Sequence, residues 1–157
     1  MSTINDLLSL ITAGIAGNAA IGTWASSNYG TTVSVSEYCD PRDEPGPENC
    51  PLVVVTAESK TAGLSPEPKR HIFQTSCIVY DDESETTATG VTRYLGCSRA
   101  EALRVLALNA IVESLPDDHH LEEIDVEYMS LEEYPLVAVL MTLNITQEKL
   151  IGYNPFE

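Results

Sequence analysis

Basic residues and cysteines are scarce in this sequence, and each shortage excludes a class of protein. The 157 residues include 8 Lys and Arg against 24 Asp and Glu, which gives a formal net charge of −16. Binding to nucleic acid or to anionic lipid needs clustered Lys and Arg, so both classes are disfavoured. The 4 cysteines are too few for a disulfide scaffold, and no pair has zinc-knuckle spacing. With no catalytic signature in view, we expect neither an enzyme nor a metal or other cofactor.

The remaining composition is that of a folded protein. It is 43% hydrophobic and 20% charged, which is enough apolar material for a packed core. The length fits one domain. We therefore expect residues 1–157 to form a single α+β domain, with long loops at 38–51 and 58–69 and a flexible C-terminal tail at 147–157.

An uncharged segment near the N-terminus, residues 7–25, raises the question of a membrane span. The first basic residue is Arg42, whereas spanning helices and signal peptides carry basic residues in their flanks. The segment also contains three glycines and several hydroxyl side chains. An amphipathic helix is favoured instead, because apolar residues recur there at helical spacing: Ile4, Leu7, Leu8, Ile11 and Ile15.

The rest of the chain predicts strands grouped on either side of a second helix. We expect strands at 31–37, 52–56, 70–80, 124–128 and 136–145, and a polar turn or hairpin tip at 81–85. The second helix is expected from 98 to 115, with Ser98 and Glu101 as its capping box and Pro116 as its stop. The resulting order is α-β-β-β-α-β-β. It predicts an α+β fold in which two helices flank a mostly antiparallel sheet.

The acidic residues are unevenly distributed. Residues 117–134 contain eight acids and no base, and the proline-rich loop at 38–51 holds four more acids, Asp40, Asp43, Glu44 and Glu48, against Arg42. A solubilising surface is the default interpretation. The alternative is a functional surface that repels a negatively charged molecule or binds a basic partner. The candidate interaction residues are Asp40, Asp43, Glu44, Asp117, Asp118, Glu122 and Glu123.

Two groups of residues have more than one interpretation. His119 and His120 follow two aspartates, and the four residues together could bind a divalent metal ion. A polar turn between helix and strand accounts for them better, because zinc ligands usually come from separate elements. Cys39 and Cys50 bracket the proline-rich loop and could pair if their geometry allowed it. Two free thiols are favoured in a reducing compartment.

The layout resembles the tail terminator (tail-completion) proteins of long-tailed bacteriophages. An N-terminal helix leads into a sheet interrupted by long loops, and a capped helix at 98–115 leads into two closing strands. The last strand, 136–145, precedes a short tail that includes residues 150–156. The likeness is one of layout and covers most of the chain. The loop from Cys39 to Pro51 is longer than the family layout leads us to expect.

The resemblance implies a structural protein of the virion tail, assembled in the host cytoplasm. Such a subunit forms a homo-oligomeric ring, expected to be a hexamer, that caps the tail tube, stops its polymerisation and joins it to the head connector or neck protein. DNA passes through without specific binding, and an acidic channel would keep its phosphates from sticking. No membrane is involved, and no site residue carries over, because the family works by surfaces.

Two other functions remain open from the residues alone. One is an acidic accessory subunit that binds a basic partner. The other is a small-molecule-binding α+β module with a pocket between helix and sheet. Self-association separates the ring protein from the accessory subunit, which stays monomeric until its partner arrives.

Overall fold

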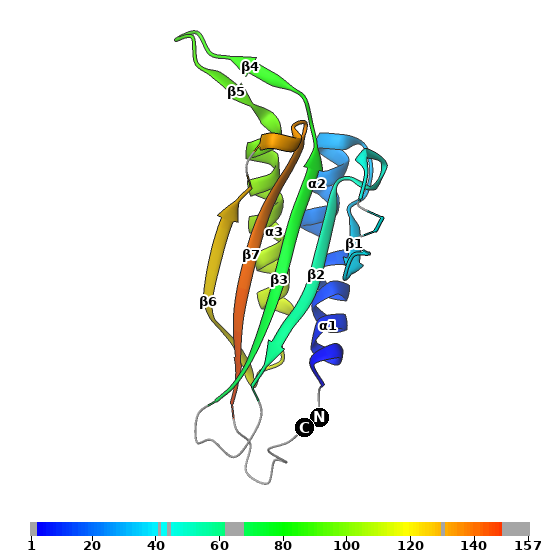
Figure 1. Ribbon diagram of the computed structural model, residues 1–157, viewed down its shortest axis with the longest axis vertical. Coiled ribbons are helices and arrows are strands. Elements are labelled where there is room, and N and C mark those ends of the chain that lie inside the picture. Colours follow the sequence, from blue (N-terminus) through cyan, green and yellow to red (C-terminus); the bar gives the residue numbers. More distant parts are fainter. Residues whose placement is uncertain (1–2, 41, 44, 62–67, 130, 149–157) are drawn as a thin grey trace.

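The computed structural model describes residues 3–40, 42–43, 45–61, 68–129 and 131–148. Along this part of the chain two helices precede a series of strands, and a third helix precedes two closing strands, which is an α+β arrangement (Figure 1). The elements are α1 (Ile4–Ala16), α2 (Ala19–Tyr29), β1 (Ser34–Glu37), β2 (Leu52–Lys60), β3 (Lys69–Tyr80), β4 (Ser84–Thr86), β5 (Thr92–Tyr94), α3 (Leu95–Ser114), β6 (His119–Tyr128) and β7 (Leu136–Gln147). Two 3-10 turns, Pro47–Asn49 and Leu131–Glu133, lie in the connections.

The main sheet has the strand order β1-β2-β3-β7-β6. Its pairs are antiparallel except for β1 and β2, which run parallel, so the sheet is mixed. The helices lie together on one face of this sheet (Figure 1). The α+β class and the mostly antiparallel sheet are as predicted, with a third helix and a separate two-stranded β4–β5 hairpin added to the predicted order.

The core lies between the helices and the sheet. The predicted stripe on α1 is buried at Leu7, Leu8, Ile11 and Ile15. Alternate residues of the central strands face it, because successive side chains of a strand point to opposite faces. Those residues are Phe73, Cys77 and Val79 on β3, and Val137, Val139, Met141, Leu143 and Ile145 on β7.

The N-terminal helical region is two helices rather than one. α1 ends at Gly17, and the Asn18 side chain accepts hydrogen bonds from the backbone N–H groups of Ala20 and Ile21, which starts α2. No single helix among the described residues is long and apolar enough to cross a membrane. Taken together, α1 and α2 meet the length and composition requirement but are bent by 51° at their junction.

The predicted capping box of the α3 helix is wrong. The helix begins at Leu95, and its first turn has no side-chain cap from Tyr94. The Ser98 hydroxyl donates 2.9 Å back to the carbonyl of Leu95, and Glu101 pairs with Arg104 instead of reaching the backbone. Local sequence favoured a start at Ser98, whereas the preceding β5 strand delivers the chain directly into a helical turn.

Several predicted boundaries shift by a few residues. β1 begins at Ser34 and β2 extends to Lys60, so the predicted loop 58–69 narrows to 61–68, of which residues 62–67 lie outside the described part. Gln147 is the buried last residue of β7 rather than the start of a tail. Residues 149–157, which make up most of the predicted tail, also lie outside the described residues.

The α3 core face gives a stability prediction. Ile111 is fully buried, whereas Leu106 packs at the edge of the core and is only half-buried. Ile111→Ala should lower the free energy of unfolding by about 2–5 kcal/mol, and Leu106→Ala by less. Urea denaturation measures both changes. Val112, 47% exposed on the same helix, is the control, and Val112→Ala should change stability by no more than about 0.5 kcal/mol. Equal losses at positions 111 and 112 would contradict this packing.

Candidate assembly surface

The sheet face opposite the helices carries no acidic side chain on β3 and β7, and its one charged side chain on these two strands is that of Arg70, near the start of β3. Its side chains alternate with the buried core residues of β2, β3 and β7 and are half-buried. Aliphatic groups are interspersed with hydroxyl and amide groups. We call this surface the neutral face; it comprises Thr56, Ile72, Gln74, Ser76, Ile78, Leu136, Ala138, Leu140, Thr142 and Asn144. In the described part of the chain no helix packs on it (Figure 1).

A row of carboxylates borders the neutral face along β6. Glu123, Asp125 and Glu127 lie opposite Asn144, Thr142 and Leu140 of β7, and therefore on the same face of the sheet. All three side chains are exposed and make no ion pair with the described residues. We call these three residues the acidic row. Glu122, beside the β-bulge at Leu121/Glu123, is also exposed.

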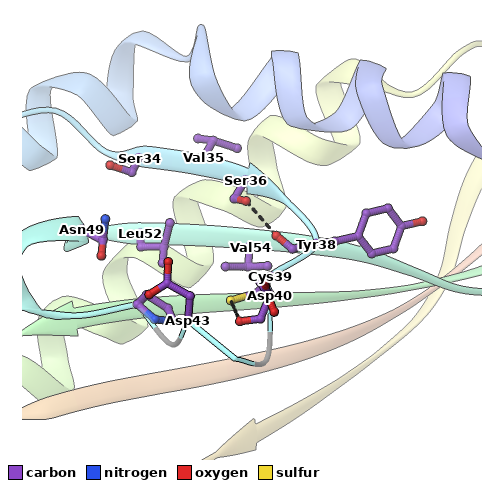
Figure 2. A pocket seen from close by; sticks show the side chains of 11 residues that line it. Ser34, Val35, Ser36, Tyr38, Cys39, Asp40, Asp43, Asn49, Leu52 and Val54 are labelled. Carbon is purple, nitrogen blue, oxygen red and sulfur yellow. Dashed lines mark hydrogen bonds between the residues drawn. The ribbon is translucent and has the colours of Figure 1, made fainter.

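The acids of the proline-rich loop lie at the opposite border of the neutral face. Asp40 and Asp43 line a groove of about 320 Å³ above β1 and β2, together with Leu52 and Val54 (Figure 2). Asp40 is neutralised by Arg42, whose guanidinium lies 2.9 Å away. Glu44 lies outside the described residues. Of the predicted acids, Asp40 and Asp43 therefore lie on one flank of this face and Glu123 lies on the other.

Asp117 and Asp118 have different environments. Asp117 is exposed in the turn after α3. Asp118 accepts hydrogen bonds from Gln147 (3.1 Å) and from the His119 ring (2.7 Å). Partial burial raises the pKa of the Asp118 carboxyl, but these hydrogen bonds outweigh it and hold that pKa below its usual value. The hydrogen bond from Gln147 to Asp118 thus links the start of β6 to the end of β7.

The two adjacent histidines point in opposite directions, as expected on a strand, because they begin β6 rather than lying in the predicted turn. His119 is buried and stacks against His71, with ring centroids 5.7 Å apart. His120 is exposed, with Glu148 3.3 Å from its ring. Among the described residues no group of three or more histidine, cysteine or carboxylate side chains is arranged to hold a metal ion.

His71 is buried among groups that disfavour its charged form. Its Nε2 lies 3.4 Å from Gln147 Oε1, and its Nδ1 has no hydrogen-bond partner among the described residues. Burial lowers the pKa of His71 to about 4, and the nearby His119, Lys60 and Lys69 add to the effect. The imidazole is therefore neutral in the folded protein at neutral pH.

This environment predicts acid sensitivity. Below about pH 6.5 an unfolded His71 binds a proton that the folded protein excludes until about pH 4. Stability should therefore fall as the pH drops through this window, by up to about 3 kcal/mol at about 1.4 kcal/mol per pKa unit. Denaturation at several pH values measures the slope. His71→Gln should flatten it, whereas the exposed-site control His120→Gln should not; indistinguishable slopes in wild type and His71→Gln would refute the prediction.

All four cysteines are free thiols, so Cys39 and Cys50 are not paired. Cys39 is exposed and Cys50 is half-buried at the base of the loop. Burial and the nearby Glu48 carboxylate raise the pKa of Cys50 to about 11. That thiol is therefore protonated at neutral pH and is a poor nucleophile.

A hairpin that sequence reasoning missed protrudes from one end of the molecule. β4 and β5 form a two-stranded ribbon that extends beyond the end of the main sheet (Figure 1). Its turn places Gly90 at a φ of 84°, a conformation that favours glycine. The available signal in the sequence was this glycine within a threonine-rich segment. We call residues 84–94 the arm.

Asp81 anchors the base of the arm, contrary to the prediction that residues 81–85 form a solvated turn. Its side chain is only 2% exposed and pairs with Arg99 of α3, which also lies 2.8 Å from Glu83. The Tyr29 hydroxyl donates a 2.9 Å hydrogen bond to Asp81. Gly96 allows the close approach, since a Cβ there would lie 3.1 Å from the Asp81 Cβ and carbonyl. The network fixes the direction in which the arm leaves the body.

The comparisons with known proteins identify a fold but no sequence family. No protein-family model matches the chain, and no curated protein matches its sequence. Among solved structures it is similar to a chain from the virion of a native gene transfer agent particle, with a TM-score of 0.51 and 13% identity. The match covers 88% of this chain and 92% of that chain, so the two share a fold over nearly their whole lengths.

Proposed function

We propose that this protein is a structural protein of a phage-like virion and acts as a tail terminator. In this role it forms a ring, expected to be a hexamer, on the end of the tail tube. The ring stops tube polymerisation and joins the tail to the head connector. It is not an enzyme in this proposal, and it requires no cofactor.

The observation that carries the proposal is the likeness in fold to a chain that is part of a virion. That likeness spans nearly all of both chains, so it does not rest on one common supersecondary unit. The element order and the closing pair of strands, β6 and β7, agree with the layout of tail terminators. The protruding arm and the uncovered neutral face are features suited to assembly through surfaces rather than to catalysis.

The acidic row gives the proposed ring a channel lining. Its three carboxylates are exposed and unneutralised, whereas Asp40 is paired with Arg42 and Asp118 with Gln147 and His119. Facing a channel, the row would repel DNA phosphates over about 8 Å at physiological salt. We therefore assign the channel to the acidic row rather than to the loop acids.

Capping of tail tubes tests the proposed function directly. The purified protein is added to polymerising tail-tube subunits of the same virus, and tube lengths and ends are imaged by electron microscopy. We expect shorter tubes with a ring at one end. An unrelated acidic protein of similar mass is the control for charge alone. Tubes that keep growing at saturating protein, with bare ends, would refute the terminator function.

A further inference from the structure

The arm is built to contact something outside its own subunit. An isolated two-stranded hairpin is marginally stable in water. Nevertheless, the arm extends away from the sheet (Figure 1), with Val91 53% exposed and Tyr94 49% exposed. Its base is held by the ion pair between the buried Asp81 and Arg99, and the arm extends beyond the end of its own sheet rather than across its own neutral face (Figure 1).

The arm is also electrically neutral in a protein of net charge −16. Between Ser84 and Tyr94 the sequence contains one acid, Glu85, and one base, Arg93. Their charged groups lie 3.9 Å apart across the hairpin. The other side chains of the arm are mainly threonines, an alanine and a valine. It can therefore approach a second acidic subunit without the repulsion that most of the surface would meet.

The neutral face offers a matching environment. It mixes aliphatic with hydroxyl and amide groups, has no acidic side chain, and has Arg70 beside it on β3. It lies between the acidic row and the loop that holds Asp40 and Asp43. Contacts between copies through those flanks would set carboxylates against carboxylates. The dimensions also agree, because an arm of about five residues per strand is about 16 Å long and three strands span about 10–15 Å.

We propose that the arm of one subunit lies across the neutral face of a second copy of this chain. This inference rests on the proposed ring, because a head-to-tail contact of this kind closes into a ring when repeated. Each subunit then gives one arm and receives one. The acidic row stays uncovered beside the docked arm.

Two complementary variants test this contact. In the armless variant, residues 85–93 are replaced by Asn-Gly, which suits a two-residue turn because Ser84 and Tyr94 are register partners. In the face variant, the paired positions Gln74 and Thr142 both become Glu. Native mass spectrometry should find each variant monomeric on its own. Mixed in equal amounts they should form a 1:1 dimer, since one supplies only the face and the other only the arm.

A point substitution and a neutral control complete the experiment. Arg93→Glu leaves the exposed arm with two negative charges and should reduce assembly at least tenfold in apparent affinity, an effect that salt relieves. Glu85→Gln with Arg93→Gln keeps the arm neutral and should preserve assembly. Denaturation midpoints check that each variant is folded.

Several outcomes would overturn the inference while leaving the proposed function to its own test. A ring formed by the armless variant would show that the arm is dispensable, although the ring would stand. A mixture that stays monomeric, or a wild type that is monomeric at every salt and protein concentration, would refute the arm-to-face contact. Tube capping would then decide the terminator function separately.

Discussion

Replacing Arg99 with Leu should lower the free energy of unfolding by about 3–5 kcal/mol, the usual effect of removing one partner of a buried ion pair. The remaining carboxylate of Asp81 is 2% exposed and would lose the cation that compensates for its burial. Tyr29 and the backbone N–H of Glu83 would still donate hydrogen bonds to it, but neither carries a charge. Urea denaturation at pH 7 measures the change.

Two further variants separate the ion pair from simple loss of packing. Arg99→Leu combined with Asp81→Asn should recover much of the lost stability, because no buried charge is then left alone. Arg93→Leu is the matched control, since Arg93 belongs to an exposed pair with Glu85 and such pairs contribute about 0–1 kcal/mol. Equal losses for Arg99→Leu and Arg93→Leu would mean that the Asp81 anchor has no special role.

Reversing the charge of the acidic row should give the protein an affinity for DNA that we expect the wild type to lack. The variant carries Lys at positions 123, 125 and 127, which changes the charge of each subunit by six. If the row lines a ring channel, the rings should retain DNA, because clustered ammonium groups release counterions from phosphates. With six or more phosphate contacts, affinity should fall roughly 10³-fold or more between 50 and 200 mM salt.

A DNA retention assay across a salt series, with native mass measured in parallel, tests this expectation. The control variant has the same number of new lysines, Glu113→Lys with Asn109→Lys and Val112→Lys, and changes the charge of each subunit by four. All three of these positions are exposed on α3, on the helix side of the sheet. These lysines should not create comparable DNA retention if position rather than net charge matters. Rings of the acidic-row variant that hold no DNA would exclude the row from the channel without refuting the ring.

The strongly patterned elements were predictable from the sequence because their burial is one-sided. The apolar stripe of α1 is long enough to exclude the two-residue period of a strand. The alternation of apolar residues in β7 is long enough to exclude the 3.6-residue period of a helix. Each also buries its apolar side in the structure. β3 extends only one residue beyond its predicted start. In these segments local pattern and tertiary packing agree, which is the condition for reading structure from sequence.

The elements that were missed are those without one-sided burial. Every residue of β4 and β5 is exposed, so no hydrophobic alternation marks them. α2 buries only Ile21 and Ala25, and its start depends on a single capping residue, Asn18. Short exposed strands and weakly amphipathic helices leave little trace in apolar periodicity.

The candidate site was harder to predict than the fold, because charge partners are distant in sequence. Asp81 stands in a run of acids that is typical of a solvated turn, yet its cation is 18 positions away. Likewise, Asp118 and Gln147 meet only because β6 pairs with β7. The sequence shows where the acids stand along the chain, but strand order decides which of them share a face.

The parallel pairing of β1 with β2 sets a lower limit on the length of the loop that joins them. Two antiparallel neighbours can be joined by a loop of two residues. Two parallel neighbours need a longer connection, because the chain must return from the end of the first strand to the level of its start before the second strand begins. Here the described residues of the loop between β1 and β2 lie above β2, where Leu52 and Val54 are buried. Deletions in this loop should therefore be tolerated far less than insertions, because a shortened connection would force β1 to reverse direction or leave the sheet.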